Sequence, residues 1–359
     1  ISEASMAYTN SNNIKAARGT GGYLLGLLAW PSSDDASVYL TPAGTRRRLV
    51  SDASSDLDVD NPFYDVNKNK NTDKNNRVIT NLAFKYNPLS WLNLTARVGL
   101  DVSSTQGVLK YHPESQRAQS VGGSIDTYVD NTRNFNFQYF ATGKKSFGKL
   151  HSSLMLGSAI YDNNYTVASV RGEKFIDYEF TSINNTDLTT HRALNNLVRK
   201  RLVGFFGNAT LNYDDMVYLT FTGRNDITST LPKANNSFFY PSAQFSFIFS
   251  ELPALKNSSV ITFGKLRASI AQVGKDAPAY SLYPGLENKT STGGGYGYGF
   301  TGPSPDLKPE LTTSKEIGTE LKFYRGRLGL DVAYYHSTSK DQIVKDLRLS
   351  YGTGFILQV

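Results

Sequence analysis

Hydrophobic and polar residues alternate one by one along much of the chain, most regularly between Leu92 and Val102. The even positions of this segment are all apolar, and the odd positions carry Asn93, Thr95, Arg97, Gly99 and Asp101. Successive side chains of a β-strand point to opposite faces. The period of two therefore predicts a strand that separates an apolar environment from a polar one.

The same alternation recurs in about ten segments of the chain. The further segments are Val78–Tyr86, Phe135–Ala141, Ser152–Tyr161, Val203–Tyr213, Val217–Arg224, Ala243–Phe249, Gly264–Gln272, Ile317–Phe323 and Leu328–His336. No segment of comparable length has a convincing helical period. The pattern predicts an all-β fold.

Short and long connections between the predicted strands alternate strictly along the chain. The short ones are Asn87–Ser90, Thr142–Lys149, Asp214–Asp215, Ser250–Ile261 and Tyr324–Arg327. The long ones are Ser103–Thr132, Asp162–Lys200, Asn225–Phe239 and Val273–Leu311. This rhythm predicts a series of antiparallel hairpins whose two ends differ.

A transmembrane antiparallel β-barrel accounts for both patterns. Bacterial outer-membrane barrels have short periplasmic turns, long extracellular loops, and strands that alternate apolar outward and polar inward. Hydrocarbon cannot satisfy an open strand edge, so only a closed barrel spans the bilayer with strands. The lumen-facing residues of this barrel are predicted to include Arg97, Asp101, Lys265, Arg267 and Lys322.

Aromatic residues near the short-turn ends of the strands are predicted to form an interfacial girdle. These residues are Tyr86, Trp91, Tyr139, Tyr213 and Phe323. Each of them alone is equally compatible with an ordinary buried position, and their shared location favours the girdle.

Composition removes several other classes of protein. The longest apolar stretch, Tyr23–Trp30, is far shorter than the roughly 20 residues of a transmembrane helix. The absence of Cys excludes disulfides, thiolate metal sites and a cysteine nucleophile. The formal net charge of +7 is spread along the chain, which is typical of a solvated surface and not of a nucleic-acid-binding patch.

Both ends of the chain read as partial strands, Ile1–Thr9 and a segment opening at Gly354. Counting both ends gives about 12 strands. Because a barrel with unpaired edges is not viable in lipid, we expect the chain to be one part of a larger barrel.

Several long blocks carry a family resemblance that covers most of the chain. They are NPFYDVNKN (Asn61–Asn69) with Arg77, LSWLNLTARVGLD (Leu89–Asp101), GRNDITSTLPKANNSFFYPSAQFSFIFSELPAL (Gly223–Leu255), GKLRASIAQVGKDAPAYSL (Gly264–Leu282), PDLKPELTTSKEIGTEL (Pro305–Leu321) and RLGLDVAYYHSTSKDQI (Arg327–Ile343). These blocks resemble the SusC-like (SusC/RagA) TonB-dependent transporters of Bacteroidetes outer membranes.

The resemblance implies a plugged barrel of about 22 strands, of which residues 1–359 would be one segment of the barrel domain. The plug domain and the closing C-terminal strands have no counterpart in this chain. The implied function is uptake of oligosaccharides or peptides across the outer membrane, without chemistry on the substrate and without a cofactor. The implied partners are a SusD-like surface lipoprotein, the TonB–ExbB–ExbD energy-transducing complex and outer-membrane lipid, and nucleic acid is not expected.

Two other functions share part of this pattern. A passive porin or a surface-adhesion barrel would have the same alternation and loop asymmetry but would need no TonB. A soluble all-β binding module would not need long and short connections to alternate.

Metal and catalytic signatures are weak. The four His residues, His112, His151, His191 and His336, show no paired ligand spacing. Asp56, Asp58 and Asp60 have the alternate spacing that opens a calcium loop, with Asp52 nearby. However, Asn61 and Asn67 stand where an EF-hand loop carries Gly and Glu. A polar extracellular loop is the preferred interpretation, and a loosely held calcium ion is the alternative.

One long connection is rich in aromatic residues. Gly293–Phe300 reads GGGYGYGF, without the strand-to-helix context or the following Lys of a phosphate-binding loop. A mobile loop tip is one interpretation. In the other, the rings contact a sugar or a partner, because aromatic side chains bury much area at low entropic cost. The candidate substrate-binding residues are Tyr280, Tyr283, Tyr296, Tyr298 and Phe300.

Overall fold

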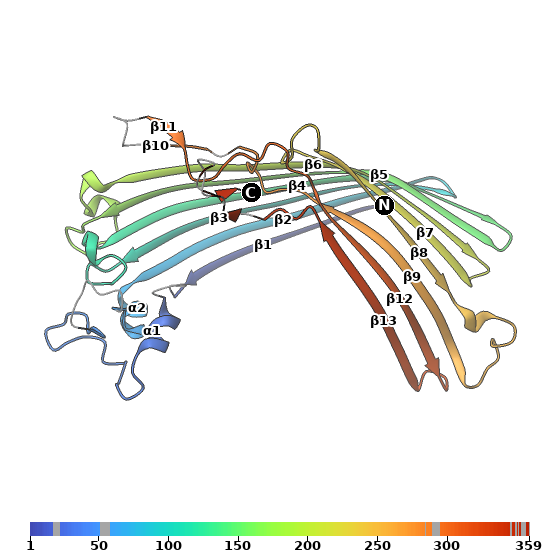
Figure 1. The fold of residues 1–359 in the computed structure, drawn as a ribbon, viewed down its shortest axis with the longest axis horizontal. Helices are drawn as coiled ribbons and strands as arrows, with labels where there is room; N and C mark the ends of the chain where they lie inside the picture. Colours follow the sequence, from blue (N-terminus) through green and yellow to red (C-terminus); the bar gives the residue numbers. More distant parts are fainter. Residues whose placement is uncertain are drawn as a thin grey trace.

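A single curved antiparallel sheet of 11 strands dominates the computed structural model (Figure 1). The structure describes residues 1–16, 22–50, 58–283, 285–288, 295–344, 347–348, 350, 352 and 357–358. The strands of the sheet are β1 (Ser2–Ile14), β2 (Lys70–Leu89), β3 (Leu92–Tyr111), β4 (Ser124–Phe147), β5 (Leu150–Glu173), β6 (Arg192–Tyr213), β7 (Val217–Thr228), β8 (Ser237–Phe247), β9 (Ile261–Lys275), β12 (Glu310–Phe323) and β13 (Leu328–Lys340). Each strand pairs with the strands before and after it in this order, so β1 and β13 form the edges.

The smaller elements all belong to the connections. Two short helices, α1 (Tyr23–Ala29) and α2 (Pro62–Lys68), lie between β1 and β2. Two small hairpins pair β10 (Leu286–Asn288) with β11 (Tyr296–Tyr298), and β14 (Leu347–Arg348) with β15 (Leu357–Gln358). Among the described residues, no helix has the length and apolar character that crossing a membrane requires.

The described C-terminal segment does not extend the large sheet. Leu357 and Gln358 of β15 pair with β14 and not with β13, so the sheet has 11 strands and not the expected 12 or so. Gly354, where that last strand was expected to open, lies outside the described residues. At the other end of the chain, β1 is longer than expected and pairs along its whole length with β2.

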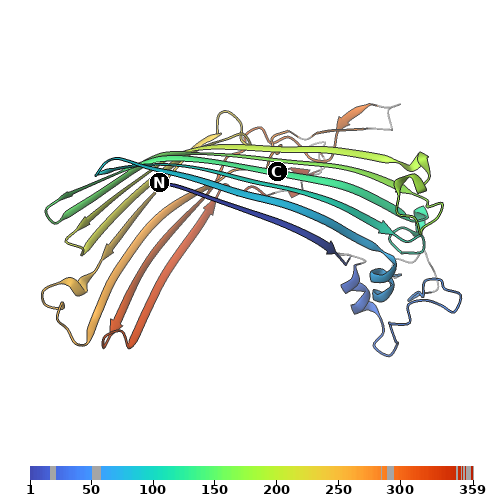
Figure 2. The same cartoon turned by 180° about the vertical axis from the view of Figure 1, so that it is seen from behind.

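Successive connections emerge alternately at the two ends of the sheet (Figure 2). Their lengths do not alternate strictly as expected, because the β8–β9 connection, residues 248–260, is longer than the β7–β8 connection, residues 229–236. The β2–β3, β4–β5, β6–β7, β8–β9 and β12–β13 connections lie at the short-turn end. The connection that contains α1 and α2, and the β3–β4 and β5–β6 connections, lie at the long-loop end (Figure 1).

Several strands continue further towards the long-loop end than the alternation indicates. β3 extends past Val102 to Tyr111, β4 begins at Ser124, β5 ends at Glu173 and β6 begins at Arg192. The expected long connections Ser103–Thr132 and Asp162–Lys200 are therefore wrong in their boundaries. Since a tilted strand crosses a bilayer in about ten residues, these strands project well beyond it, where both faces meet water and alternation is no longer required.

Register separates the two faces of the sheet. Leu100 of β3 lies opposite Phe135 of β4, and Ile160 of β5 lies opposite Val203 of β6, all in the apolar face. The neighbouring rows place Asp101 opposite Asn134 in the polar face. Many apolar-face side chains are exposed, among them Phe84, Leu100, Tyr139, Leu156, Phe205, Phe221, Leu266 and Leu330. A continuous exposed apolar surface of this extent is the surface that a barrel presents to lipid.

The predicted aromatic girdle is present in part. Tyr86, Trp91 and Tyr213 are about half exposed or more and lie next to short turns. Tyr139 is also exposed on the apolar face, where it lies opposite Ala96, near the β2–β3 turn, and opposite Ser158. Its place in the girdle stays a prediction, because β4 continues beyond it to Phe147.

Candidate functional site

The polar face of the sheet carries paired charges on adjacent strands. Arg77 of β2 donates two hydrogen bonds to Asp101 of β3, from Nε at 2.8 Å and Nη2 at 2.7 Å. Arg267 of β9 donates to Glu316 of β12 at 3.2 Å and to Asp331 of β13 at 2.7 Å. The two-pronged contact of Arg77 with one carboxylate, and the contacts of Arg267 with two, fix these side chains across the strands.

The other predicted lumen residues lie on the same polar face. Arg97 stacks its guanidinium over the Phe140 ring at 5.3 Å from the centroid. Lys322 makes an ion pair with Glu320 at 3.2 Å, and Lys265 lies opposite Glu320 in the β9–β12 register. The register therefore places all five residues on one face, and their role in lining a substrate path stays a prediction.

A buried polar cluster on this face was not predicted. Asp226 of β7 accepts a hydrogen bond from Arg224 Nε at 2.7 Å and another from the Tyr240 hydroxyl of β8. Nearby, Lys200 donates to Asp276 at 2.5 Å, and Asp276 also accepts from the hydroxyls of Thr228 and Thr230. Arg224, Asp226 and Thr228 alternate along β7, but Tyr240, Lys200 and Asp276 come from other strands and loops. The sequence alone therefore could not indicate that these groups meet.

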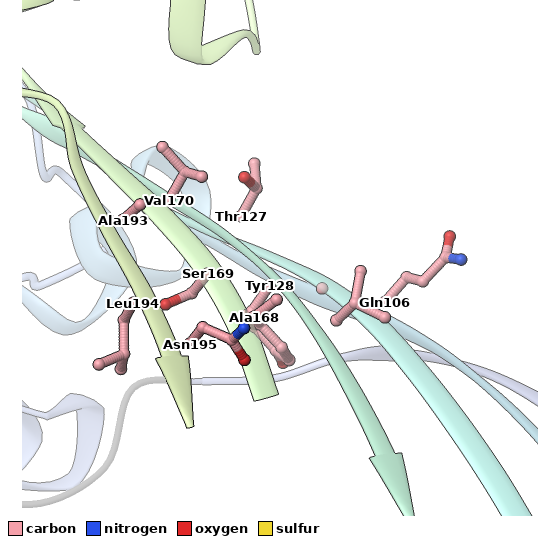
Figure 3. Close-up of a pocket in the computed structure, with 11 residues that line it drawn as sticks. Gln106, Thr127, Tyr128, Ala168, Ser169, Val170, Ala193, Leu194 and Asn195 are labelled. Atoms are coloured by element: carbon pink, nitrogen blue, oxygen red, sulfur yellow. The ribbon is translucent and has the colours of Figure 1, made fainter. Parts of the chain in front are cut away.

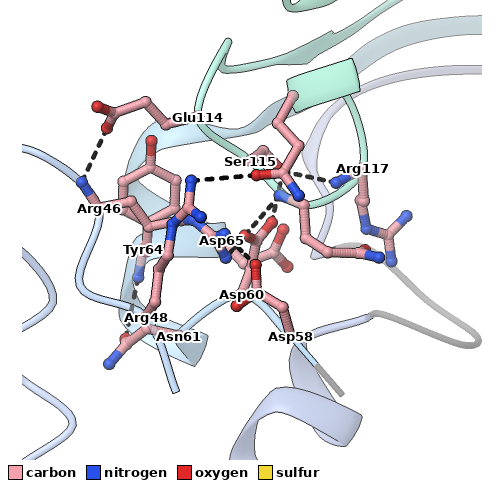
Figure 4. Close-up of polar contacts among 12 residues, drawn as sticks. Arg46, Arg48, Asp58, Asp60, Asn61, Tyr64, Asp65, Glu114, Ser115 and Arg117 are labelled. Atoms are coloured by element: carbon pink, nitrogen blue, oxygen red, sulfur yellow. Dashed lines mark hydrogen bonds and ion pairs between the residues drawn. The ribbon is translucent and has the colours of Figure 1, made fainter. Parts of the chain in front are cut away.

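A second cluster holds the long β1–β2 connection against the β3–β4 connection at the long-loop end (Figure 4). The Arg46 guanidinium is almost fully buried and donates to both Asp58 and Asp60, the latter at 2.8 Å. Asp60 also accepts from Ser115 Oγ and from the backbone N–H of Gln116 at 2.9 Å. The Arg46 backbone N–H donates to Glu114 at 2.8 Å.

Local sequence sets up the helix in this cluster. Asn61 precedes α2, and its Oδ1 accepts from the backbone N–H groups of Phe63 and Tyr64, while Pro62 occupies the first helical turn. An Asn cap followed by Pro is a favoured helix start, because the cap satisfies donors that the helix leaves free and Pro has no N–H to satisfy. The cap directs Tyr64 and Asp65 into the buried interior of the cluster.

Aromatic contacts complete the cluster around His112. The Tyr64 hydroxyl and His112 Nδ1 are 2.7 Å apart, and the Tyr178 ring packs edge-on against the imidazole at 4.4 Å between centroids. Burial lowers the pKa of His112 below its ordinary value, and it raises the pKa of Tyr178 to about 12. Burial likewise raises the pKa of Asp65. This cluster is built to hold loops together and has no exposed reactive group in the described residues.

The calcium hypothesis involves residues of the same cluster. Asp58 and Asp60 are the acceptors of the Arg46 guanidinium. Asp52 and Asp56 lie outside the described residues. Within the part of the chain that the structure describes, no group of three or more acidic or His side chains is arranged to hold a metal ion.

The five aromatic candidates are exposed in the β9–β12 connection, which contains the β10–β11 hairpin. Tyr283, Tyr296 and Phe300 each expose about two thirds of their surface or more. The hydroxyl of Tyr280 accepts a hydrogen bond from the backbone N–H of Arg199 at 3.2 Å, which ties this connection to β6. Tyr298 is also exposed. Gly293 and Gly294 of the glycine run lie outside the described residues. Substrate contact by these rings stays a prediction.

A hollow of about 630 Å³ lies across β3 to β6 in the half of the sheet nearest the long loops (Figure 3). Small side chains of Thr127, Ala168, Ser169 and Ala193 line much of it. Gly107 also lines the hollow. The Tyr128 ring lies against this glycine, and a Cβ at this position would come within 2.1 Å of that ring.

The two-faced sheet, the exposed apolar band and the asymmetric ends define a bacterial outer-membrane β-barrel. The family described as TonB dependent receptor-like, β-barrel, matches residues 7–358, and the chain belongs to this family. Members of this family are transporters and receptors of the bacterial outer membrane, and they are not enzymes. The family predicted from the sequence is thereby confirmed.

Individual relatives agree with this assignment. TonB-dependent receptor P3 of Formosa agariphila is 25% identical over 338 residues, which are 90% of this chain and 32% of the relative. TonB-dependent receptor P26 of the same organism is 30% identical over 249 residues, 66% of this chain and 25% of the relative. The chain therefore spans about a third or less of these relatives.

Among solved structures, the fold is similar to that of the RagAB peptide transporter, with a TM-score of 0.79 and 18% identity over 99% of this chain and 40% of that one. The RagAB peptide importer in the closed-closed state gives a TM-score of 0.80 at the same identity and coverage. This similarity shows that the fold is shared.

Proposed function

We propose that residues 1–359 form one segment of the barrel domain of an energised importer, which takes up oligosaccharides or peptides across the outer membrane. The plug domain and the closing strands of that barrel would lie outside this chain. The observation that carries the proposal is the polar face, where charged groups of both signs are held in cross-strand pairs, such as Arg77 with Asp101. A path of many paired, partly exposed polar groups offers weak binding at several places, which allows a solute to enter and to leave.

The long-loop end supports a role in capture. The exposed rings of Tyr280, Tyr283, Tyr296, Tyr298 and Phe300 would contact the substrate there, either against sugar faces or against peptide side chains. The RagAB structures are described as a peptide transporter, which keeps peptides beside oligosaccharides as a substrate class.

A SusD-like surface lipoprotein is the proposed partner at this end. The α1 helix exposes Leu24 and Leu28, with exposed fractions of 64% and 74%, one turn apart on one side of the helix. Exposed leucines on a loop that meets water offer an apolar surface that the lipoprotein would cover. TonB–ExbB–ExbD would supply energy through the plug region.

Uptake in the bacterium that carries the full-length gene tests the proposal. We expect gene deletion to abolish growth on either an oligosaccharide or a peptide mixture as the sole nutrient, and the full-length gene to restore it. Deletion of TonB should abolish the same uptake. A passive porin would keep uptake without TonB, and an adhesion barrel would leave uptake unchanged in every strain.

Copurification tests the partner separately. The full-length receptor, extracted from outer membranes in mild detergent, should retain a surface lipoprotein. Leu24→Asp combined with Leu28→Asp should reduce the retained lipoprotein at least several-fold, because carboxylates would replace the exposed apolar surface. Leu188→Asp, an exposed leucine of the β5–β6 connection, is the matched control. Equal retention in all variants would contradict the assigned contact surface.

A further inference from the structure

Three arginines gather around one carboxylate on the apolar face of the sheet, where charged residues are otherwise rare. Arg201 of β6 donates to Asp162 of β5 from Nε at 2.8 Å and from Nη2 at 2.5 Å. Arg199 donates to the same Asp162 oxygen at 3.1 Å. Arg133 of β4 approaches the other oxygen at 3.8 Å, which is an ion-pair distance and too long for a hydrogen bond. We call Arg133, Asp162, Arg199 and Arg201 the outer arginine cluster.

Register shows that this cluster points away from the lumen. Asp162 lies opposite Phe135 on β4 and opposite Arg201 on β6, so it belongs to the same rows as the exposed apolar side chains. Arg133 precedes Phe135 by two residues and shares its face. The predicted lumen residue Asp101 belongs to the opposite rows.

The cluster also lies at the height of the bilayer surface. On β6, the outward positions from Val203 to Tyr213 are all apolar or glycine, and Tyr213 lies at the short-turn end. This run has about the ten residues that a tilted strand needs to cross the hydrocarbon. Arg201 is the next outward residue of β6 beyond Val203, at the end of this run that is nearer the long loops. In this family, the long-loop end faces the cell exterior, so the cluster meets the outer leaflet.

The charges within the cluster do not cancel. Three guanidinium groups face one carboxylate, which gives a local net charge of +2. Asp162 is nearly buried, at 8% side-chain exposure, whereas Arg133, Arg199 and Arg201 each remain about half exposed. In strands β3 to β7, which the structure describes in full, Asp162 is the one carboxylate among the outward-facing positions.

Arg133 has unused donors within this cluster. Among the described residues its side chain makes no hydrogen bond, and Oδ1 of Asp162 also has no hydrogen-bond partner. A group with several acceptor oxygens placed between the arginines would engage the donors that Asp162 leaves free. Phosphate fits best, because a guanidinium binds phosphate through two parallel hydrogen bonds.

We propose that the outer arginine cluster binds the phosphate of an outer-leaflet glycolipid. The acyl chains of that lipid would pack on the apolar rows below the cluster, against side chains such as Phe135 and Phe205. The lipid would then bridge β4, β5 and β6 and fix the barrel wall at the leaflet where substrate enters. Basic sites at a membrane border recognise anionic headgroups in this way.

Lipid binding to the full-length receptor tests this site. The receptor, delipidated in detergent and checked for the heat-modifiable mobility of a folded barrel, is titrated with monophosphoryl lipid A by native mass spectrometry. We expect Arg133→Gln to weaken binding at least five-fold, because it removes a phosphate donor and leaves the Asp162 hydrogen bonds intact. Arg97→Gln, the same substitution on the polar face, should leave lipid binding unchanged.

Two probes separate the possible sources of the anion. Lipid A without phosphate should bind at least five-fold more weakly than the monophosphoryl form. Inorganic phosphate alone should not bind measurably, since it lacks acyl chains. Equal binding of the two lipids, or binding of phosphate alone with the affinity of the lipid, would overturn the proposal.

Asp162→Asn distinguishes a lipid site from a purely structural cluster. If the arginines exist to hold the carboxylate, the variant melts at a lower temperature and its lipid affinity does not rise. If they bind lipid phosphate, the local charge rises from +2 to +3 and the affinity for monophosphoryl lipid A increases. Unchanged lipid affinity in both Asp162→Asn and Arg133→Gln would reject the site.

Discussion

Arg46 is the residue on which the packing of the β1–β2 connection depends most. It is 3% exposed and makes ion pairs with both Asp58 and Asp60. Removal of one partner from a buried ion pair leaves an uncompensated charge and costs about 3–5 kcal/mol. We expect Arg46→Met to release this connection and to make it sensitive to proteinase K on intact cells, while the barrel remains folded.

The neighbouring Arg48 provides the control for this prediction. It is only half-buried and donates one hydrogen bond, at 3.3 Å, to Gln119. Arg48→Met removes the same charge from the same segment and should leave the cleavage rate near that of the wild type. Equal protection of both variants would show that the Arg46 ion pairs do not hold the connection.

His112 makes the same loop packing sensitive to pH. Burial lowers its folded-state pKa below the ordinary value of 6.5, so the unfolded loop binds more protons than the folded one as the pH falls. The stability that the neutral imidazole contributes is present above the unfolded pKa and is lost as the pH falls through it. Proteolysis of the loops should therefore accelerate between pH 7.5 and pH 5.5, a range that spans about one unit on either side of that value.

His112→Asn isolates this titration. The Asn oxygen can accept the hydrogen bonds that His112 Nδ1 shares with Tyr64 and the Glu114 backbone, but it carries no titratable proton. The pH dependence of cleavage should flatten in this variant. His151→Asn, in β5 at the short-turn end, should retain the wild-type dependence. Asp65 contributes a pH dependence of the opposite sign. Burial raises its pKa above the ordinary value of 3.8, so its contribution to stability increases as the pH falls.

At the scale of single strands, adjacent residues of β6 should tolerate charge very differently. Ala209 belongs to the apolar rows near the middle of the Val203–Tyr213 run, and Asn208 belongs to the polar rows. Arginine at the lipid-facing midplane of a barrel costs about 2–4 kcal/mol. We expect Ala209→Arg to reduce the yield of heat-modifiable barrel in the outer membrane sharply, and Asn208→Arg to reduce it little. The reverse order would show that the register is shifted by one residue.

Strands could be predicted from the sequence only where the membrane imposes two different environments. From Leu92 to Val102 the lipid and the lumen impose alternation, and this part of β3 was predicted correctly. From Ser103 to Tyr111 the strand meets water on both faces, its residues lose the period of two, and it was predicted as a loop. The strand continues there because its backbone pairs with β2 and β4, a long-range effect without a local signal.

Clusters at the site escaped prediction for the same reason. The Asp58 and Asp60 spacing was visible, but its partner Arg46 depends on how a long connection folds back. The outer arginine cluster was equally hidden, because Arg133, Asp162 and Arg199 come from three strands and become neighbours only through register. Lumen-facing residues were placed on one face from parity alone, since parity is a local property of each strand.

At the scale of the whole molecule, the two ends of the sheet should face opposite sides of the outer membrane. The chain contains no Cys, so single cysteines can report the side on which each end lies, provided that any Cys elsewhere in the full-length protein is replaced. Ala234 is exposed in the β7–β8 connection at the long-loop end, and Arg327 is exposed in the β12–β13 turn. Both substitutions change surface positions outside the strands and should leave the barrel intact.

We expect Ala234→Cys to react with a membrane-impermeant maleimide on intact cells, because the long loops of such barrels face the exterior. Arg327→Cys should react only after the outer membrane is permeabilised. The same orientation places the outer arginine cluster in the outer leaflet and the β10–β11 hairpin on the exterior side of the membrane. Labelling of Arg327→Cys on intact cells would reverse the barrel and would remove both the capture role of the long loops and the glycolipid site.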